Sequence, residues 1–295
     1  MHEVDRTVVT VQEIGEQLQT AGHGVVVLDV RYVLGQPDAG RPSFLQGHIP
    51  GACYLDLEED LSDVKGEHEG RHPLPPPAVL CTRFAQVGID PDTQVVVCDS
   101  GSGDMAPHAW WLLRYLGHEA VTVLDGGFAA WRAAGLPIES GNPALHPAVW
   151  QHCSPHREWV ADRAYVGELH SRPATVLVDA RDRERWAGVI EPIDRLAGHI
   201  PGAINIPWKM NFVPVSETST VDAGRRWRSP EELRLLYAPL CEADEAVIYC
   251  GSGVTSCVDV LATQRAGLPW PRLYAGSWSD WISYREAPLA TGHRP

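Results

Sequence analysis

Gly47–Ala52 reads Gly-His-Ile-Pro-Gly-Ala, and the same six residues return at Gly198–Ala203, an offset of 198 − 47 = 151. Two further pairs of similar segments keep an offset of 150: Leu28–Arg31 with Val178–Arg181, and Asp125–Trp131 with Ala275–Trp281. A repeat of this length is too long for a solenoid and matches the size of an ordinary domain. The 295-residue chain is therefore predicted to contain two tandem domains of one fold.

Each half alternates short apolar runs with helix-compatible segments. Such alternation predicts an α/β fold in which a mostly parallel sheet is flanked by helices on both faces. We place the N-terminal domain at residues 1–140, a linker rich in Pro and His at 141–154, and the C-terminal domain at 155–295. Gly35–Pro42 and Val213–Gly224 are interpreted as surface insertions.

Cys250 ends the apolar run Ala246–Tyr249 and opens the loop Cys-Gly-Ser-Gly-Val-Thr, which a helix-compatible segment follows. A strand–Cys–loop–helix unit directs backbone N–H groups and the positive end of a helix at the sulfur. This environment lowers a thiol pKa and suits a thiolate that must hold a second sulfur atom or an anion. A buried core cysteine is the alternative, but the Gly-x-Gly directly after Cys250 favours a functional loop.

The two halves differ at this position. The run Val95–Asp99 matches Val247–Cys250 with one residue of slack. An offset of 151 places Asp99 opposite Cys250, and an offset of 152 would place Cys98 there. Asp99 is preferred because the Gly-His-Ile-Pro-Gly-Ala repeat also has an offset of 151. The first domain then carries a carboxylate where the second carries a thiol. We therefore expect the N-terminal domain to be catalytically silent.

Composition limits the possible functions. A net charge of −14 disfavours a nucleic-acid or anionic-membrane surface, since both require a basic face. The seven cysteines are odd in number and lack paired C-x-x-C spacing, so we expect neither a disulfide framework nor a structural metal. The same cysteine pattern makes a reducing cytoplasm the expected location. Met1–Arg6 contains no apolar leader and no run is long enough to span a membrane, which predicts a soluble protein. No cofactor is expected.

Taken together, the repeated Gly-His-Ile-Pro-Gly-Ala turns, the Asp-x-Arg strands and the C-terminal Cys loop resemble the two-domain rhodanese sulfurtransferases over about Val8–Trp281. The loop Cys250–Thr255 is similar to that of the 3-mercaptopyruvate sulfurtransferase branch, whereas thiosulfate-type relatives tend to place basic residues directly after the cysteine. The resemblance implies transfer of a sulfane sulfur from 3-mercaptopyruvate to a thiol or cyanide, with thiosulfate as the alternative donor. A thioredoxin-like protein or a small thiol would be the acceptor.

The Cys250 loop itself explains this chemistry. A Cys250 thiolate attacks the donor sulfur and keeps it as a persulfide, while the carbon fragment leaves as pyruvate enolate. Small residues let the loop amides approach the outer sulfur, so Gly251, Gly253, Val254 and Thr255 are expected to contact the substrate. Ser252 is placed either to donate a hydrogen bond to the leaving fragment or to cap the following helix.

Further site residues follow from the resemblance. Arg185, which precedes an aromatic residue, matches the arginine that binds the substrate carboxylate, and Arg195 is the candidate second arginine. His72 matches a histidine of the N-terminal domain that faces the thiol. Glu58 stands where the branch has an aspartate, which implies a Ser252–His72–Glu58 relay. The alternative for each is an ordinary surface side chain.

Three other classes of protein fit this sequence less well. A cysteine phosphatase on this fold needs an arginine at position 256, where this chain has Ser256. A dithiol oxidoreductase would pair Cys250 with Cys257, which is expected about 10 Å away and turned toward the core. A binding module without activity would not be expected to keep the cysteine in one copy.

Overall fold

The computed structural model describes residues 7–20, 24–169, 172, 174–213 and 224–294. Met1–Arg6 and nearly all of the expected insertion Val213–Gly224 lie outside these residues. The chain forms two compact units: the first comprises Met1–Ser62, Pro75–His156 and Phe212–Trp227, and the second comprises Asp63–Leu74, Arg157–Asn211 and Arg228–Pro295. Each unit therefore includes one segment from the other half of the sequence.

Both units contain a five-stranded sheet with the same strand order, and every pair of neighbouring strands is parallel. The strands of the first sheet, in the order β1-β5-β4-β2-β3, are β1 (Val8–Val9), β2 (Val25–Asp29), β3 (Cys53–Tyr54), β4 (Gln94–Cys98) and β5 (Val121–Leu124). Those of the second, in the order β6-β10-β9-β7-β8, are β6 (Val160–Ala161), β7 (Thr175–Asp179), β8 (Ala203–Asn205), β9 (Glu245–Tyr249) and β10 (Arg272–Tyr274). The predicted α/β fold with two parallel sheets is confirmed.

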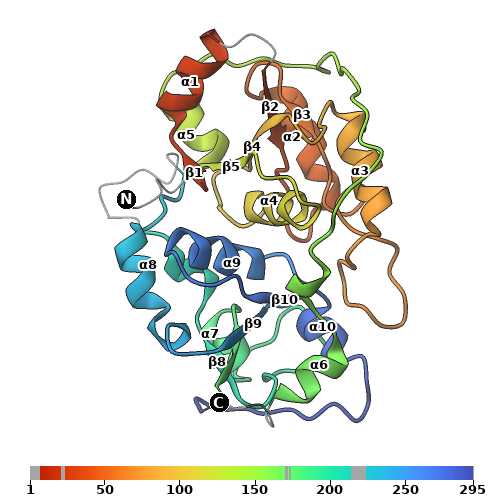
Figure 1. The fold of residues 1–295 in the computed structure, drawn as a ribbon, viewed down its shortest axis with the longest axis vertical. Coiled ribbons are helices and arrows are strands. Elements are labelled where there is room, and N and C mark those ends of the chain that lie inside the picture. Colours follow the sequence, from red (N-terminus) through yellow and green to blue (C-terminus); the bar gives the residue numbers. More distant parts are fainter. Residues whose placement is uncertain (1–6, 21–23, 170–171, 173, 214–223, 295) are drawn as a thin grey trace. The chain divides into compact units, whose positions relative to one another are not determined.

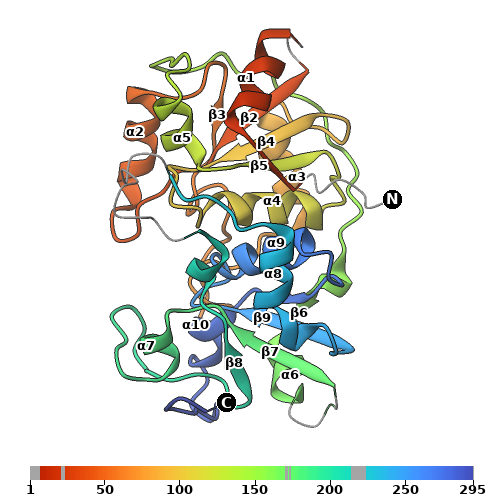
Figure 2. The same ribbon diagram turned by 90° about the vertical axis from the view of Figure 1, so that its left-hand side faces the viewer.

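Helices cover both faces of the first sheet (Figures 1 and 2). They are α1 (Val11–Thr20), α2 (Gly40–Gln46), α3 (Pro77–Gln86), α4 (Ala106–Tyr115) and α5 (Gly127–Ala133). Ile14, Phe44 and Trp131, from α1, α2 and α5, share one buried cluster with Val27 and Val96 of the sheet. Successive strand residues point to opposite faces of a sheet. The strand residues next to Val27 and Val96 therefore face the other side, where α4 contacts β4 and β5.

The second unit repeats this plan. Its helices are α6 (Arg163–Gly167), α7 (Arg183–Trp186), α8 (Pro230–Leu236), α9 (Ser256–Arg265) and α10 (Ser277–Trp281). Val166 of α6 and Trp281 of α10 join Val247 and Tyr249 of β9 in one buried cluster. α9 packs on β9, β10 and α8 (Figure 2). Short 3₁₀ turns complete the two units at Pro37–Ala39, Arg157–Trp159, Trp208–Asn211 and Ala238–Leu240.

Local signals explain where several elements begin. Thr10 and Glu13 exchange hydrogen bonds at the start of α1, and Ser229 and Glu232 form a capping box at the start of α8, with Pro230 at its first position. Gly35–Pro42 lies mostly at the surface, as expected, but it contains regular structure: Pro37–Ala39 forms a 3₁₀ turn and α2 begins at Gly40. Burial of Phe44 stabilises this helix despite its Gly and Pro.

The repeated motifs make the same contacts in both units. Asp29 and Arg31 form a buried two-pronged ion pair, as do Asp179 and Arg181. His48 bonds the Phe44 carbonyl oxygen through Nδ1 at 2.9 Å and stacks on the Phe44 ring. His199 bonds the carbonyl oxygen of Trp186 at 2.8 Å and stacks on its indole in the same way. These histidines hold the turns that lead into β3 and β8.

Among the described residues, no helix combines the length and the apolar character that crossing a membrane would require.

Candidate active site

The strand register shows how the two copies correspond. Asp29 pairs with Cys98 in the first sheet, and Asp179 pairs with Tyr249 in the second, so the next residues, Asp99 and Cys250, are equivalent. From these residues to the following helix the chain advances 106 − 99 = 7 positions in the first unit and 256 − 250 = 6 in the second. The loop of the first unit is therefore one residue longer, which explains why the repeat offset changes from 151 to 150.

In the first unit the Asp99 carboxylate fills its own loop. It accepts hydrogen bonds from the backbone N–H groups of Gly101 at 2.8 Å and of Met105 and Ala106 at 3.2 Å. Asp99 is buried, so these bonds satisfy the charged oxygens as well as the amides. The backbone N–H groups of this loop that could bind an external anion are therefore already bound to the Asp99 side chain.

In the second unit a turn at the start of α10 supports the Cys250 loop. The Cys250 N–H donates to Ser277 Oγ at 3.1 Å, and the N–H groups of Trp278 and Ser279 donate to the carbonyl oxygens of Cys250 and Gly251, each at 3.0 Å. Gly253 has a φ of +86°, and a Cβ there would lie 2.3 Å from the Ala275 carbonyl oxygen. The loop therefore requires glycine at this position.

The environment of Cys250 favours the thiolate. Burial alone would raise the pKa of this thiol, but the hydroxyl groups of Ser256 and Thr255 and the backbone of Ser252 and Ser256 close to the sulfur outweigh burial and lower the pKa below its ordinary value. A lowered pKa increases the thiolate fraction at neutral pH, and the thiolate is the nucleophile. Thr255, expected from the sequence to contact substrate, thus also stabilises the sulfur.

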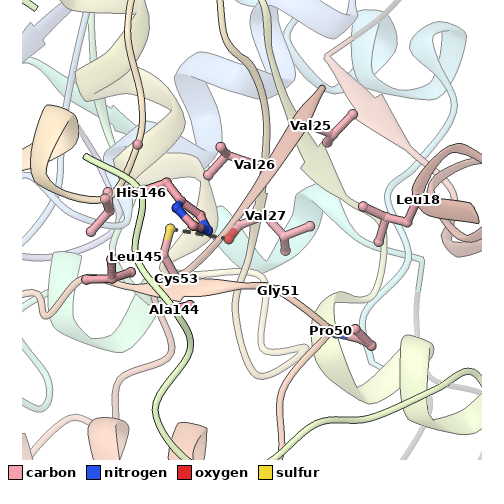
Figure 3. Close-up of a pocket in the computed structure, with 12 residues that line it drawn as sticks. Leu18, Val25, Val26, Val27, Pro50, Gly51, Cys53, Ala144, Leu145 and His146 are labelled. Atoms are coloured by element: carbon pink, nitrogen blue, oxygen red, sulfur yellow. Dashed lines mark hydrogen bonds between the residues drawn. The ribbon is translucent and has the colours of Figure 1, made fainter. Parts of the chain in front are cut away.

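Other cysteines have the opposite environment. Burial raises the pKa of Cys53 to about 12 and that of Cys257 well above its ordinary value. The Cys257 thiol donates to the Gly253 carbonyl oxygen at 3.3 Å. Cys53 lines a cavity of about 540 Å³ in the first unit, where its sulfur points at the Val27 carbonyl oxygen (Figure 3). That cavity holds an inert thiol and is no candidate for this chemistry.

His72 reaches the loop from the segment Asp63–Leu74, which packs within the second unit. Hydrogen bonds join the Glu69 N–H to Asp280 Oδ1 at 2.9 Å and the Arg71 N–H to Ser279 Oγ at 3.1 Å. This attachment brings His72 Nδ1 to 2.8 Å from Ser252 Oγ, and both side chains are buried. A serine hydroxyl two residues from Cys250 is thereby linked to a group that can carry a proton.

Two arginines lie against the same loop. A Cβ on Gly251 would be 2.8 Å from Arg71 Nη2 and 3.5 Å from Arg185 Nη2, so both guanidinium groups contact the residue next to Cys250. Glu191 accepts from Arg185 Nε at 3.0 Å. Asp194 accepts from both arginines, with Arg185 Nη2 at 2.9 Å. The resulting arrangement offers planar donors for a carboxylate beside the thiol.

The other expected site residues lie as follows. Arg195 donates to the Ile282 carbonyl oxygen and is exposed. Glu58 belongs to the first unit, where Tyr32 OH donates to its Oε1 at 3.2 Å. Val254 is buried, and its carbonyl oxygen accepts from the Cys257 N–H at 3.1 Å. Cys250, Ser252, His72 and Arg185 are thus brought together within the second unit.

Arg71 was not among the residues expected from the sequence. Its position directly before His72, in Gly70-Arg71-His72-Pro73, was the available signal, because a backbone that delivers His72 to the loop also delivers its neighbour. The signal was weak, since an arginine in a Pro-rich loop is usually solvated.

Comparison with known proteins identifies the family. The model of the rhodanese-like domain matches residues 10–134 and again 162–284. A "Probable 3-mercaptopyruvate sulfurtransferase" of Pseudomonas aeruginosa is 42% identical over 288 residues, covering 96% of this chain and 97% of the relative. A thiosulfate sulfurtransferase of Rattus norvegicus is 32% identical, covering 97% and 94%. The structure of a 3-mercaptopyruvate sulfurtransferase from Leishmania major matches with a TM-score of 0.83 at 29% identity, covering 98% of this chain and 77% of that one.

The chain belongs to the rhodanese family, with two rhodanese-like domains in tandem. It is a sulfurtransferase, as the resemblance in the sequence implied.

Proposed function

We propose that the protein transfers a sulfane sulfur from 3-mercaptopyruvate through a persulfide on Cys250 to a thiol or cyanide acceptor. The observation that carries the proposal is the convergence of the Arg71 and Arg185 guanidinium groups on Gly251, next to a thiol of lowered pKa. A donor with a sulfur and a carboxylate on one short carbon chain can meet both features at once.

In the first half-reaction the Cys250 thiolate attacks the donor sulfur and forms an S–S bond. The C–S bond breaks, its electron pair stays with carbon as pyruvate enolate, and a proton then converts the enolate to pyruvate. The loop glycines and amides from Gly251 to Thr255 surround the persulfide. In the second half-reaction an acceptor thiolate or cyanide attacks the outer sulfur and restores the Cys250 thiolate.

Ser252 and His72 supply the proton that the carbon fragment needs. Their 2.8 Å hydrogen bond allows the Ser252 hydroxyl to donate while His72 replaces its proton. The sequence resemblance, and no contact described above, is the basis for proposing that Glu58 orients His72 and that Arg195 is a secondary contact for the carboxylate. The first domain, whose loop is filled by Asp99, is assigned no transfer step.

The acceptor and the compartment complete the proposal. A thioredoxin-like protein, a small thiol or cyanide can all present a compact nucleophile to the persulfide. All seven cysteines are free thiols, which supports a reducing cytoplasm. Thiosulfate remains the alternative donor, because relatives of both donor types share this fold.

Steady-state kinetics with both donors and cyanide as the common acceptor test the donor assignment. We expect a higher kcat/KM for 3-mercaptopyruvate, because the loop from Gly251 to Thr255 contains no basic residue and the two arginines beside it are already paired with Asp194 and Glu191, which leaves no excess charge to balance a thiosulfate dianion. A higher kcat/KM for thiosulfate would reverse the assignment.

Replacing Arg185 measures the contribution of the carboxylate contact. We expect Arg185→Ala to lower kcat/KM for 3-mercaptopyruvate by an amount equivalent to roughly 1.5–3 kcal/mol, the size of a lost charge-assisted hydrogen bond. Arg183→Ala is the matched control, because Arg183 lies in the same helix and is exposed. Equal kcat/KM values for the two variants would show that Arg185 does not bind the substrate carboxylate.

A further inference from the structure

The Asp194 carboxylate occupies the space between the two arginines of the site. Its Oδ1 accepts from Arg71 Nη1 and its Oδ2 from Arg185 Nη2, so each oxygen binds one guanidinium group. The side chain is only 4% exposed. Two arginines that each give one donor to a shared carboxylate form the arrangement that a carboxylate ligand would require.

The charges around this carboxylate cancel. Arg71 and Arg185 are balanced by Asp194 and Glu191, and the neighbouring Arg181 is paired with Asp179. Burial is the largest influence on Asp194 and raises its pKa, while Arg71 opposes the shift and Glu191 reinforces it. With Asp194 in place, the two arginines present no excess positive charge to an incoming anion.

We propose that Asp194 is a specificity-determining residue: its carboxylate is an internal ligand of Arg71 and Arg185 that the donor's anionic group must displace. The inference rests on the proposed function, in which these arginines bind the donor carboxylate. Exchanging one carboxylate for another keeps the charge balance of the site. A dianion gains less binding free energy, because no positive charge in the site balances its second negative charge.

Removing the charge of Asp194 should therefore strengthen anion binding and reduce discrimination between donors. In Asp194→Asn the site has one net positive charge, and the Coulomb energy of an anion there scales with the charge that the anion carries. The substitution should therefore increase the affinity for a dianion such as thiosulfate by more than the affinity for a monocarboxylate such as pyruvate.

Calorimetric titration tests this without catalysis. A Cys250→Ser background prevents reaction, and pyruvate and thiosulfate serve as the probes. We expect Asp194→Asn to lower the Kd of pyruvate at least about tenfold, the size of one charge-assisted hydrogen bond, and that of thiosulfate by a larger factor. Glu184→Gln removes an equal charge from an exposed position close to Arg185 and should change either Kd by less than about twofold.

An unchanged or weaker affinity for pyruvate in Asp194→Asn would overturn the proposal, since Asp194 would then only orient the arginines. An equal gain in Glu184→Gln would do the same, because the effect would then follow the net charge of the protein. If Asp194→Asn does not fold, Asp194→Ser leaves room for an added anion. Pyruvate should then raise its unfolding temperature more than that of the Cys250→Ser parent, and an equal or smaller rise would contradict displacement.

The titration also separates this inference from the proposed function. If 3-mercaptopyruvate left no sulfur on Cys250, the proposed donor would be wrong. Pyruvate and thiosulfate binding would still report whether Asp194 competes for the two arginines.

Discussion

Cys250→Ser is expected to abolish sulfur transfer with either donor. Serine keeps the size of the side chain, but its hydroxyl remains protonated at neutral pH and cannot form a persulfide. The loop is held by the N–H groups of Trp278 and Ser279, which donate to the carbonyl oxygens of Cys250 and Gly251 and not to the sulfur, so the loop should persist in the variant. Intact-mass measurement of the wild type after donor treatment should show one added sulfur, about 32 Da, on the Cys250 peptide.

Other cysteines provide matched controls for this experiment. Substitutions of Cys98, Cys153 and Cys257 should leave most of the activity. Cys98 and Cys257 are buried thiols of raised pKa. Cys153 lies in the sequence between α5 and β6, away from the Cys250 loop in the chain. Added sulfur on any cysteine other than Cys250 would contradict the assignment.

His72→Ala should slow persulfide formation from 3-mercaptopyruvate by roughly 10²–10⁴-fold, the range for loss of general acid–base catalysis. The reason is the 2.8 Å bond between His72 Nδ1 and Ser252 Oγ. In the proposed mechanism the Ser252 hydroxyl donates to the leaving carbon fragment and His72 replaces that proton. Sulfur transfer out of a preformed persulfide should change less, because no carbon leaving group needs a proton in that step. Glu58→Gln should give a milder defect in the first half-reaction, as expected for an orienting group.

Single-turnover measurements separate the two half-reactions. His68→Ala is a suitable control, since His68 lies in the same segment but bonds Ser283 and stacks on Tyr284. Equal rates of persulfide formation in the wild type and His72→Ala would reduce His72 to a residue that only supports the loop.

The parts of the fold that were predictable follow short-range rules. The strands Val25–Asp29, Gln94–Cys98 and Thr175–Asp179 can be recognised in the sequence because each is an apolar run bounded by polar or small residues. The repeat then located the second copy of each motif. The helix Gly40–Gln46 was missed because its Gly and Pro argue against a helix, while the burial of Phe44 that stabilises it is a tertiary effect.

The site was predictable to the extent that it is local in sequence. The Cys250 loop is contiguous, so its glycines and following helix could be read directly. Arg71 and Asp194 are 123 residues apart, and no periodicity predicts that two loops will meet. Asp194 and Arg195 show the difficulty most clearly, because adjacent residues have unrelated partners: Asp194 binds the two arginines, and Arg195 binds the Ile282 carbonyl oxygen.

The segments that the two units take from each other's half of the sequence limit how the protein can be divided. A cut between the repeats would give an N-terminal fragment without Phe212–Trp227 and a C-terminal fragment without Asp63–Leu74. The C-terminal fragment would keep the Cys250 loop but lose both Arg71 and His72. Duplication of the fold has therefore not left two interchangeable modules: a half-length version of this enzyme would need the Asp63–Leu74 segment grafted back before it could contain all residues of the proposed site.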